Sequence, residues 1–445
     1  MGASAEWRYC LFVIPPSHRE AAVFGPAAIT AVIVGQGYVG LPLAQAAVTA
    51  GIRIIGLETR ADIVERLNAG GSHVDDVADT EVAAMVAAGY TATTDASVVA
   101  EADVVVICVP TPLSGLREPD LSAIRGATAS IAPHLKPGAL VVLESTTYPG
   151  TTEEVVRPIL ESAGHVVGRD VLLAYSPERI DPGNTVYTIA STPKIVGGVD
   201  ERSTAATVEF YSHFVDRVVT ARGTREAETA KLLENTYRHI NIALVNEMAR
   251  FCHELGIDVW DVIAAAETKP FGFQAFRPGP GVGGHCIPID PNYLSYEVRR
   301  RLGEPFRFVE LAEEINRGMP AYVVERIRRG LAARGRDLTA ATVLLLGVTY
   351  KPDISDQRES PAIEVAGLLK AAGAVVTFHD PWVSTWHLDG QPIERVGDLN
   401  AAVTEADATV LLQAHREYDV DALAHRAAYL FDTRGVSTTG DAERL

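Results

Sequence analysis

The chain has 445 residues, of which 47% are hydrophobic and 22% charged, so it has the composition of an ordinary globular protein and room for about three domains. Its formal net charge of −18 argues against nucleic acid or an anionic membrane surface as a partner. The four cysteines show neither metal-ligand spacing nor a disulfide framework, and no apolar run reaches the ~18 residues of a membrane span, so a metal-free protein of the reducing cytoplasm is expected.

Residues 1–28 stand apart from the rest of the chain. They contain an apolar stretch that is short and is stopped by Pro15 and Pro16. The positive charge that should precede the apolar part of a signal peptide is weak. We therefore interpret residues 1–28 as an N-terminal appendage or an overlong start, with a signal peptide as the weaker alternative.

Residues 29–216 alternate between apolar runs and helical stretches, which predicts a doubly wound α/β domain. Each expected strand is apolar throughout, as parallel strands buried on both faces are. The expected strands are residues 28–35, 52–57, 103–109, 139–143 and 170–174, and a helix is expected over residues 39–50.

The turn after the first strand has the pattern Gly35-x-Gly37-x-x-Gly40, and Glu58 ends the second strand. Glycines there permit a tight turn and a close approach of the backbone to a pyrophosphate, which the helix N-terminus would hold. Glu58 would accept hydrogen bonds from the adenosine ribose and repel a 2′-phosphate. NAD is therefore the expected cofactor, although Arg60 lies close enough to weaken the preference over NADP. The alternative is a glycine-rich turn that binds nothing.

Residues 217–332 are predicted to form a central helical domain. The stretch from residue 222 to 255 is typical of one long helix, because it has no proline and only one glycine, near its start. It is too long for a simple crossover between strands. It could pack against a second subunit, so a homodimer or a higher homo-oligomer is expected.

Cys286 is the thiol most suited to chemistry. A run of glycines precedes it and prolines follow it, which indicates a shaped loop, where functional groups concentrate. A thiol there can add to an aldehyde, hydride loss to NAD then gives a thioester, and water hydrolyses it. Asp290 could act as a base or orient the water, whereas His285 is expected to point away from the thiol. Cys108 and Cys252 are interpreted as core residues.

Residues 333–445 resume the alternation and predict a second, smaller α/β domain. Its expected strands are residues 341–347, 375–379, 408–412 and 429–432, with a helix over residues 361–372. The expected fold class is α/β, with two Rossmann-like doubly wound parallel-sheet domains joined by a central helical domain that has a long connecting helix.

Six motifs follow one another along the chain: VGQGYVGLP at 34–42, CVPTP at 108–112, ESTTYPGT at 144–151, GVGGHC at 281–286, GVTYK at 347–351 and DQRESPA at 356–362. Together they resemble the nucleotide-sugar 6-dehydrogenases, a family that includes the UDP-glucose and GDP-mannose enzymes. The resemblance covers residues 30–438. It implies an NAD-dependent enzyme that binds a UDP-sugar and oxidises its C6 alcohol to the carboxylate, consuming two NAD per sugar.

The resemblance also implies roles for single residues. Cys286 matches the nucleophile, and Lys231 and Asn235 match the pair that stabilises the oxyanion at C6. Because these two are four residues apart on the expected long helix, they share one of its faces. Thr111 matches a threonine that positions the water, and Glu178 matches its general base. The catalytic residues expected in full are Cys286, Lys231, Asn235, Glu178, Thr111 and Asp290.

Further residues are expected at the two ligands. Cationic side chains suit the diphosphate of a UDP-sugar, although each could instead be a plain surface charge, and Arg277 matches a position that in some relatives reaches across a dimer interface. The residues expected at the cofactor are Gly35, Gly37, Tyr38, Val39, Gly40, Glu58, Arg60, Thr111 and Thr146. The residues expected at the substrate are Glu178, Arg179, Lys231, Asn235, Arg277, Gly283, Lys351, Arg358 and Arg434.

The sugar is indicated by the surroundings of the thiol. The UDP-glucose enzymes typically have serine before the cysteine and lysine before the aspartate, where this chain has His285 and Ile289. This loop resembles the branch that acts on 2-acetamido sugars, so UDP-N-acetylglucosamine is the expected substrate, with UDP-N-acetylmannosamine or UDP-glucose as alternatives. Outside the family, the alternatives are a two-electron hydroxyacid dehydrogenase and a silent nucleotide-sugar-binding protein.

Overall fold

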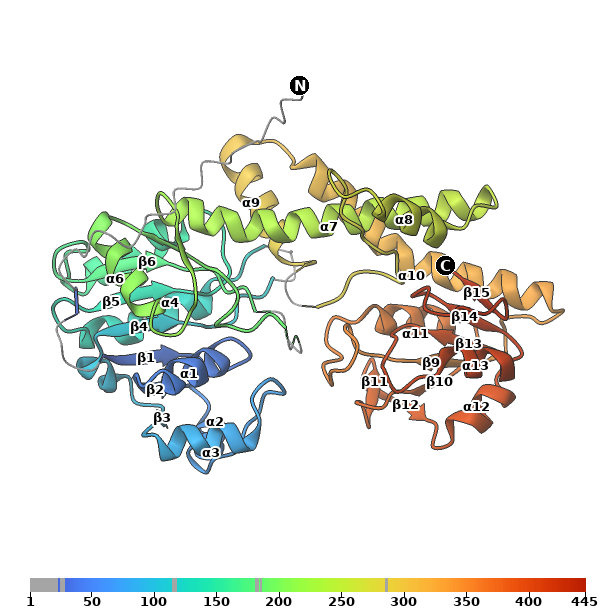
Figure 1. Cartoon of the computed structure of the whole chain (residues 1–445), viewed down its shortest axis with the longest axis horizontal. Helices are drawn as coiled ribbons and strands as arrows, with labels where there is room; N and C mark the ends of the chain where they lie inside the picture. The colour runs from blue at the N-terminus through green and yellow to red at the C-terminus, as the bar shows by residue number, and fades with distance from the viewer. Residues whose placement is uncertain (1–22, 25–28, 114–117, 181–183, 185, 285–286) are drawn as a thin grey trace, which may run out of the picture. The chain divides into compact units, whose positions relative to one another are not determined.

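The computed structural model describes residues 23–24, 29–113, 118–180, 184, 186–284 and 287–445 (Figure 1). The chain forms two compact units, and each is described by itself. Unit 1 comprises Met1–Thr111 and Leu121–Lys231, and unit 2 comprises Pro112–Asp120 and Leu232–Leu445. The boundary falls within one long helix, α7 (Thr224–Glu254), after Lys231.

Unit 1 is built on an eight-stranded sheet with the order β3-β2-β1-β4-β5-β6-β7-β8. All neighbours are parallel except β6 and β7, which are antiparallel. The first six strands have the order 3-2-1-4-5-6 of a dinucleotide-binding sheet, so the strand order reverses between β1 and β4. The strands are β1 (Thr30–Val34), β2 (Arg53–Leu57), β3 (Thr91–Thr93), β4 (Val104–Ile107), β5 (Leu140–Leu143), β6 (Leu172–Tyr175), β7 (Lys194–Gly198) and β8 (Val218–Thr220).

Helices of unit 1 cover this sheet, and the five strands expected in this part of the sequence are all present. β1, β4, β5 and β6 are buried along their whole length, which explains their uninterrupted apolar sequence. The helices are α1 (Gly40–Thr49), α2 (Ala61–Asn68), α3 (Asp79–Ala87), η1 (Ala96–Glu101), α4 (Ser122–Ile131), η2 (Ala132–His134), the π-helical turn η3 (Thr152–Val156), α5 (Arg157–Ser162), α6 (Glu201–Tyr211) and the start of α7.

The described part of the N-terminal appendage is attached to unit 1. Phe24 is buried in the same hydrophobic core as Phe210 and Phe214. The backbone N–H of Val23 donates a hydrogen bond to Glu209 Oε2 at 2.8 Å. This pair of residues therefore packs on the α6 side of the unit, where the sequence indicated only a loose segment.

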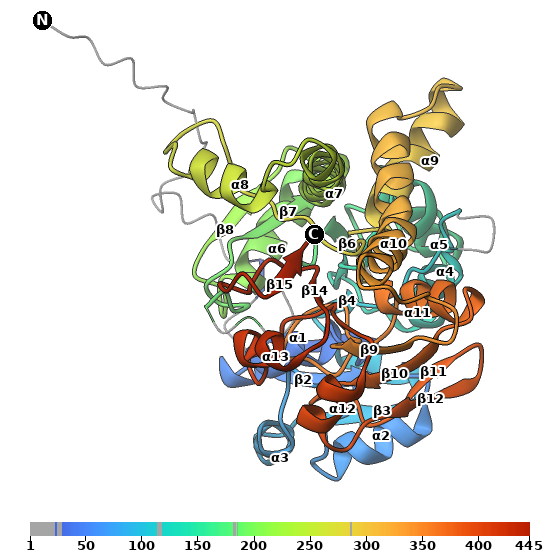
Figure 2. The ribbon, with the colours of Figure 1, turned by 90° about the vertical axis from the view of Figure 1, so that its right-hand side faces the viewer.

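Unit 2 is built on a seven-stranded sheet with the order β11-β12-β10-β9-β13-β14-β15, in which only β11 and β12 are antiparallel. Its helix α10 packs against α11 (Figure 2). The strands are β9 (Thr342–Leu346), β10 (Val375–His379), β11 (Trp386–Leu388), β12 (Gln391–Arg395), β13 (Ala408–Leu411), β14 (Leu430–Asp432) and β15 (Ala442–Arg444). The helices are the remainder of α7, then α8 (Val259–Glu267), α9 (Asp290–Leu302), α10 (Arg307–Ala333), α11 (Pro361–Ala371), α12 (Leu399–Glu405) and α13 (Val420–Arg426).

The central strand β9 shows why this sheet needs helices on both faces. Val343 and Leu345 belong to one core cluster, and Leu344 and Leu346 belong to a second. Successive side chains of a strand point to opposite faces, so an entirely apolar strand has to be covered twice. The two expected α/β units with helical segments between them are thus confirmed.

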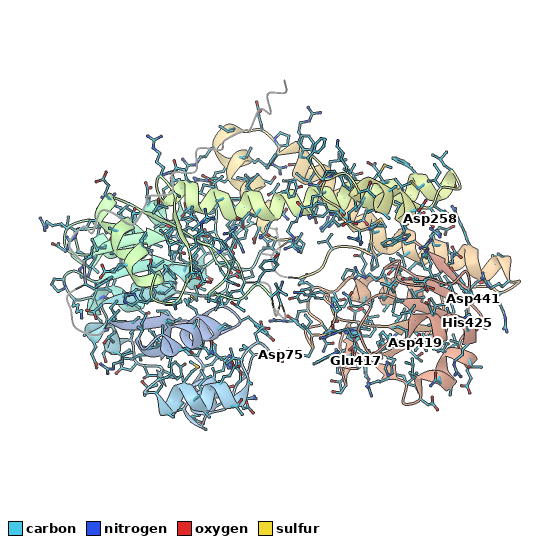
Figure 3. All side chains as sticks on the ribbon, in the orientation of Figure 1. Asp75, Asp258, Glu417, Asp419, His425 and Asp441 are labelled. Carbon is cyan, nitrogen blue, oxygen red and sulfur yellow. The ribbon has the colours of Figure 1, made fainter. Side chains whose placement is uncertain are left out.

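The last strand ties the helical part of unit 2 to its sheet. Trp260 of α8 donates from Nε1 to the carbonyl oxygen of Leu445 at 2.9 Å. Asp258, labelled in Figure 3, caps the N-terminus of α8 and also pairs with Arg444 of β15. Gly435 has φ +63°, and a Cβ there would lie 2.2 Å from the Trp260 ring. Across the described ranges, no helix combines the length and the apolar character that crossing a membrane requires.

Candidate active site

The turn after β1 requires glycine at two of its three expected positions. Gly35 has φ +88°, and a Cβ there would lie 2.5 Å from the carbonyl oxygen of Cys108. A Cβ on Gly40, at the start of α1, would lie 1.9 Å from the carbonyl oxygen of Gly35. A Cβ on Gly37 would meet no described atom within 4 Å. Gly37 therefore faces open space, into which a pyrophosphate can approach the backbone.

Glu58 follows β2, and its carboxylate is held beside this turn. Oε2 accepts a hydrogen bond from Gln36 N at 3.0 Å, and Oε1 accepts from Thr59 N at 2.8 Å and Arg60 N at 3.1 Å. A carboxylate has further acceptor positions, which ribose hydroxyls can use. Arg60 pairs with Asp62, and both side chains are exposed. The cation that the sequence placed near a 2′-phosphate thus already has a carboxylate partner.

The remaining residues expected at the cofactor lie along the same edge of unit 1. Tyr38 and Val39 are partly buried against its core. Thr111 and Thr146 follow β4 and β5, at the carboxyl ends of the strands, where doubly wound sheets bind ligands. Cys108, also after β4, is buried, and burial raises the pKa of its thiol well above the usual value. It is a core thiol, as expected.

Lys231 contacts Glu178 in unit 1. The Nζ of Lys231 lies 2.6 Å from the carbonyl oxygen of Glu178 and 3.2 Å from its Oε2. Both side chains are buried, with 5% and 7% exposed. The backbone N–H of Ile180 donates to Glu178 Oε1, and Arg179 donates to the carbonyl oxygen of Pro193. The segment after β6 is therefore held at several points.

Asn235 contacts Asp290 in unit 2. Asn235 Nδ2 donates to Asp290 Oδ2, and Asp290, with 1% exposed, is the first residue of α9. The unpaired N–H groups at a helix N-terminus favour a carboxylate at this place. Lys231 and Asn235, expected to act on one oxyanion, thus each have a polar partner of their own in this structure. Cys286 and His285 lie outside the described residues.

The glycine run before Cys286 packs closely against other parts of unit 2. A Cβ on Gly283 would lie 2.6 Å from the carbonyl oxygen of Glu359, and one on Gly284 would lie 3.0 Å from the ring of Tyr350. A Cβ on Gly279 would lie 2.9 Å from Nη1 of Arg434. Three segments that are distant in the sequence therefore meet here, and side chains in place of these glycines would separate them.

Among the cations expected at the substrate, Lys351, Arg358 and Arg434 lie in or beside these segments. Arg434 donates from Nε to the carbonyl oxygen of Leu412 at 2.6 Å, and burial lowers its pKa to about 10. Arg358 forms a two-point ion pair with Asp356 at 2.9 and 2.8 Å. Lys351 directly follows Tyr350 and Arg358 directly precedes Glu359, the residues that meet Gly284 and Gly283. Arg277 instead forms an exposed ion pair with Glu267 at 3.0 Å.

Comparison with known proteins identifies the family of the chain. The NAD binding domain of the UDP-glucose/GDP-mannose dehydrogenase family matches residues 29–215, the central domain of that family matches residues 225–318, and its UDP binding domain matches residues 344–439. The chain belongs to the UDP-glucose/GDP-mannose dehydrogenase family. It is therefore an NAD-dependent oxidoreductase that acts on a CH–OH group, and the cofactor expected from the sequence is confirmed.

Individual members of this family are similar to the chain over nearly its full length. The UDP-N-acetyl-D-mannosamine dehydrogenase of Salmonella typhi is 34% identical over 424 residues, 91% of this chain and 98% of that protein. The NDP-N-acetyl-D-galactosaminuronic acid dehydrogenase of Ralstonia nicotianae is 35% identical, over 91% of this chain and 95% of that protein. The structure of the UDP-D-ManNAc dehydrogenase from Pyrococcus horikoshii has 30% identity and a TM-score of 0.84, covering 94% of this chain and 99% of that one.

The described residues of this dehydrogenase fit NAD. The open space at Gly37 and the fixed carboxylate of Glu58 supply a place for the pyrophosphate and acceptors for the ribose. NAD supplies the hydride acceptor when bound. The chain's own residues bind and orient it.

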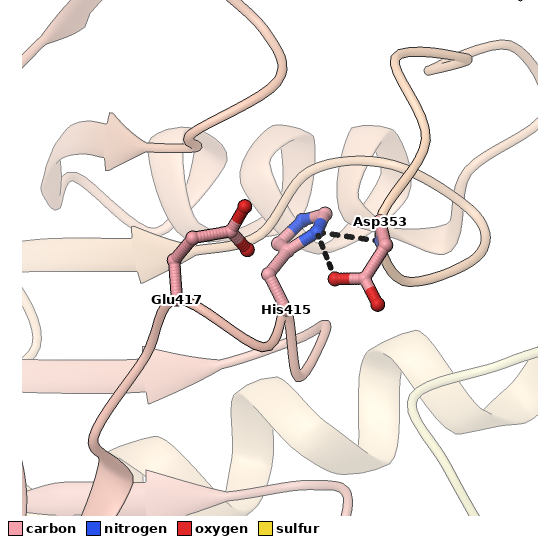
Figure 4. Close-up of side chains that lie close together, drawn as sticks. All are labelled: Asp353, His415 and Glu417. Atoms are coloured by element: carbon pink, nitrogen blue, oxygen red, sulfur yellow. Dashed lines mark hydrogen bonds and ion pairs between the residues drawn. The ribbon is translucent and has the colours of Figure 1, made fainter.

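Asp353, His415 and Glu417 form the one group of the described part of unit 2 with spacing for a metal ion (Figure 4). His415 Nδ1 accepts a hydrogen bond from Asp353 N at 2.9 Å, and Nε2 lies 3.1 Å from Asp380 Oδ2. Both ring nitrogens are therefore engaged, and Asp353 also pairs with Arg416. These contacts explain the cluster as a support for the loop after β9, because Asp380 also accepts from Val348 N at 2.7 Å.

Two buried polar side chains, Gln36 and Lys194, make contacts that had no signal in the sequence pattern. Gln36, at an unspecified position of the glycine fingerprint, donates to the carbonyl oxygen of Ile33 and accepts from Tyr90 OH, both at 2.7 Å. Lys194 pairs with Glu144 although 50 residues separate them. Sequence spacing cannot reveal such pairs, because the sheet alone brings them together.

Proposed function

We propose that this dehydrogenase oxidises the C6 alcohol of a UDP-linked acetamido sugar to the carboxylate through a thioester on Cys286. The first hydride leaves C6 for NAD, the hydroxyl proton is released, and an aldehyde results. The thiolate of Cys286 adds to the aldehyde carbon, and a second hydride then leaves for a second NAD. Water attacks the thioester, the carbon–sulfur bond breaks, and the carboxylate and the free thiol are formed. One sugar thus yields two NADH and consumes one water.

Each of the proposed catalytic side chains has its own role in this reaction. Lys231 and Asn235 stabilise the oxyanion that develops on the C6 oxygen, since an ammonium and an amide N–H can both donate to it. Glu178 removes a proton from the attacking water, which Thr111 positions. Asp290 holds the amide of Asn235 in its donating orientation.

The observation that carries the proposal is the buried contact between Asn235 and Asp290. A buried polar side chain needs a partner, and here the partner is a carboxylate four residues after Cys286 in the sequence. The amide that should bind the oxyanion is thereby tied to the segment that carries the thiol. One helical turn before Asn235, α7 carries Lys231, and a helix turns side chains four residues apart to the same face.

The sugar is proposed from the relatives. The Salmonella and Pyrococcus proteins are named for UDP-N-acetyl-D-mannosamine and the Ralstonia protein for an N-acetylgalactosaminuronic acid, so all three are named for acetamido sugars. They support an acetamido sugar over UDP-glucose. They favour UDP-N-acetylmannosamine over UDP-N-acetylglucosamine, the substrate expected from the loop around the thiol.

A substrate panel tests the sugar. Purified enzyme is incubated with NAD and with UDP-N-acetylmannosamine, UDP-N-acetylglucosamine, UDP-N-acetylgalactosamine or UDP-glucose in turn, and the NADH and uronate formed are counted. An acetamido sugar should give the highest kcat/KM and two NADH per uronate. If UDP-glucose is the best substrate, the sugar is wrong, and if one NADH forms per sugar, the four-electron reaction is wrong.

Substitution of the thiol tests the mechanism. Cys286→Ala should abolish uronate formation. Cys252→Ala, which removes a buried core thiol, should retain it. Full uronate formation by Cys286→Ala would exclude the thioester. A two-electron hydroxyacid dehydrogenase would form one NADH per substrate and no uronate, with or without the thiol, and a silent binding protein would produce no NADH in either form.

We also propose that α7 pairs with α7 of a second copy. Exposed apolar side chains recur along this helix at spacings of three, four and seven residues, which places them in one stripe. They are Leu233, Tyr237, Leu244, Met248 and Phe251, and Leu255 continues the spacing directly after the helix. A stripe of this length on a water-soluble helix is suited to a second apolar stripe. Leu244→Glu combined with Phe251→Glu should dissociate the dimer, and the sedimentation coefficient should fall to that of a monomer. An unchanged sedimentation coefficient would refute the pairing.

The domain limits of 29–216, 217–332 and 333–445 also remain a proposal. The ranges matched by the three family domains support them.

A further inference from the structure

Lys194 and Glu144 form a buried ion pair in unit 1 that the proposed reaction does not use. Glu144 follows β5 and is 1% exposed, and Lys194 begins β7 and is 8% exposed. Lys194 Nζ binds Glu144 Oε1, and Tyr211 OH donates to Glu144 Oε2 at 2.6 Å. The ammonium also lies 5.0 Å from the centre of the Tyr211 ring. Since β6 lies between β5 and β7 in the sheet, the pair bridges the strand that leads to Glu178.

Stability alone does not account for this arrangement. Removing two charges from water is costly, and a buried ion pair contributes about as much stability as apolar side chains of the same volume, or less. The pair does, however, fix one geometry, because movement of either residue breaks the ion pair and leaves two buried charges apart. A positioning role requires contacts from the pair to a functional segment. Residues at the start of β7 make such contacts with the segment that carries Glu178.

The residues on either side of Lys194 hold the segment that carries Glu178. Ser176 donates from Oγ to the carbonyl oxygen of Ile195 at 2.8 Å. Arg179 donates to the carbonyl oxygen of Pro193. In an extended strand these two carbonyl groups, two residues apart, point the same way. The Lys194 side chain thus fixes the backbone at the start of β7. The carbonyl groups of that backbone accept hydrogen bonds from the residues on either side of Glu178.

Two further contacts complete the support. The backbone N–H of Ser176 donates to the carbonyl oxygen of Leu143 at 3.1 Å, next to Glu144. Lys231 holds the carbonyl oxygen of Glu178 from the side of α7. Glu178 is therefore held between α7 and the frame formed by β5 and β7.

We propose that Lys194, Glu144 and Tyr211 are positioning residues for Glu178 and that they act on hydrolysis of the thioester. The proposal rests on the proposed function, since it takes Glu178 as the base toward water. The three residues touch neither sugar nor cofactor in this scheme. Their loss displaces Glu178 and leaves the two hydride transfers intact.

The test compares variants of the full-length enzyme. Lys194→Met leaves a buried carboxylate unpaired and could prevent folding, so Lys194→Met combined with Glu144→Gln removes both charges at once. Tyr211→Phe removes a single hydroxyl. Lys136→Met, which breaks a partly exposed ion pair with Asp103 in the same unit, is the matched control.

Three quantities are measured with the sugar that the panel identifies: kcat, both KM values, and the fraction of enzyme carrying a covalent sugar adduct after rapid acid quenching, by intact-protein mass spectrometry. In the double variant kcat should fall by about tenfold to a hundredfold, as for a small displacement of a catalytic group. Both KM values should stay within about threefold, and the adduct should accumulate. Tyr211→Phe should show the same pattern more weakly, and Lys136→Met none of it.

A double variant with wild-type kcat, or one whose kcat falls without accumulation of the adduct, overturns the positioning role. If the double variant does not fold, the same two criteria apply to Tyr211→Phe. Failure of the proposed function is distinguishable, because it is seen in the wild-type enzyme, as fewer than two NADH per sugar.

Discussion

Lys231 donates a hydrogen bond to the carbonyl oxygen of Glu178 at 2.6 Å, and its ammonium lies 3.2 Å from the carboxylate of the same residue. One cation thus binds both the backbone and the side chain of the proposed base. The contact joins the first turns of α7 to the segment after β6. It gives Lys231 a role in placing Glu178 in addition to its proposed role at the oxyanion.

Lys231→Met should therefore be a severe change. The methionine keeps the length of the side chain but loses every donor, so kcat should fall by about 10² to 10³, as for removal of an oxyanion donor. Steady-state kinetics with the preferred sugar measure the effect, and Lys136→Met is the control. A kcat within tenfold of wild type would contradict a role for Lys231 in the reaction.

Substitutions at two glycines of the dinucleotide turn should have different effects, one on stability and the other on cofactor binding. Gly40→Ala places a Cβ 1.9 Å from a backbone oxygen, so it should lower the free energy of unfolding by about 2–3 kcal/mol. Gly37→Ala meets no described atom within 4 Å, so the protein should keep its stability. Its KM for NAD should rise by about tenfold, a loss of about 1.4 kcal/mol in binding. Thermal unfolding and NAD titration distinguish the two, and equal behaviour of both variants would refute the assignment.

Asp62 should influence the choice between NAD and NADP. It pairs with Arg60, and Asp62→Asn would release that guanidinium toward a 2′-phosphate. Because the pair is exposed, the gain should be at most about fivefold in kcat/KM for NADP. Glu58 still repels the phosphate, so NAD should remain the better cofactor. An unchanged ratio of the two kcat/KM values would show that Arg60 does not reach the ribose.

Glu228 should make stability depend on pH. It is buried, and burial raises the pKa of its carboxyl from 4.5 to about 7, against hydrogen bonds from Gly150 and Thr152 that lower it. Between these two pH values the folded protein holds a proton that the unfolded chain releases. The contribution of Glu228 to stability is therefore complete below pH 4.5 and falls as the pH rises to about 7.

Glu228→Gln, which cannot ionise, reveals this effect. From pH 5 to pH 8 the wild type should lose up to about 3 kcal/mol of unfolding free energy relative to this variant. Denaturant unfolding at both pH values measures the difference. Glu226→Gln, an exposed neighbour on α7, is the control and should show no such change. A constant difference between wild type and Glu228→Gln would contradict the raised pKa.

The predictable part of this fold lies in local patterns. The run Thr30–Val34 is apolar at every position, which predicts a strand buried on both faces, and the glycines at 35, 37 and 40 predict the turn after it. The expected strands do not include β3, β7, β8, β11, β12 or β15. Of these, β3, β8, β11 and β15 have only three residues each. Such strands are defined by their neighbours in the sheet, so their own sequence has too little pattern to reveal them.

The candidate site likewise has residues that the sequence predicts and contacts that only the structure reveals. From the residues alone came the cofactor turn, Glu58, the thiol in its glycine-rich loop and Asp290. The resemblance to the family added Lys231, Asn235 and Glu178. The partners of these residues came from the tertiary structure. Lys231 meets Glu178 across 53 residues of sequence, and Asn235 meets Asp290 across 55.

The sequence by itself thus determined the α/β class and the NAD cofactor, and it predicted the residues of the NAD site and the chemical type of the reacting groups. These depend on periodicity, on backbone freedom at glycine and on the reactivity of single side chains, all of which are local properties. Only the tertiary structure decided which charges pair, because an ion pair such as Lys194 with Glu144 joins two segments that are distant in the sequence and that the sheet brings to either side of β6. Pairing depends on distance in space, and the chain reaches those distances only when it has folded.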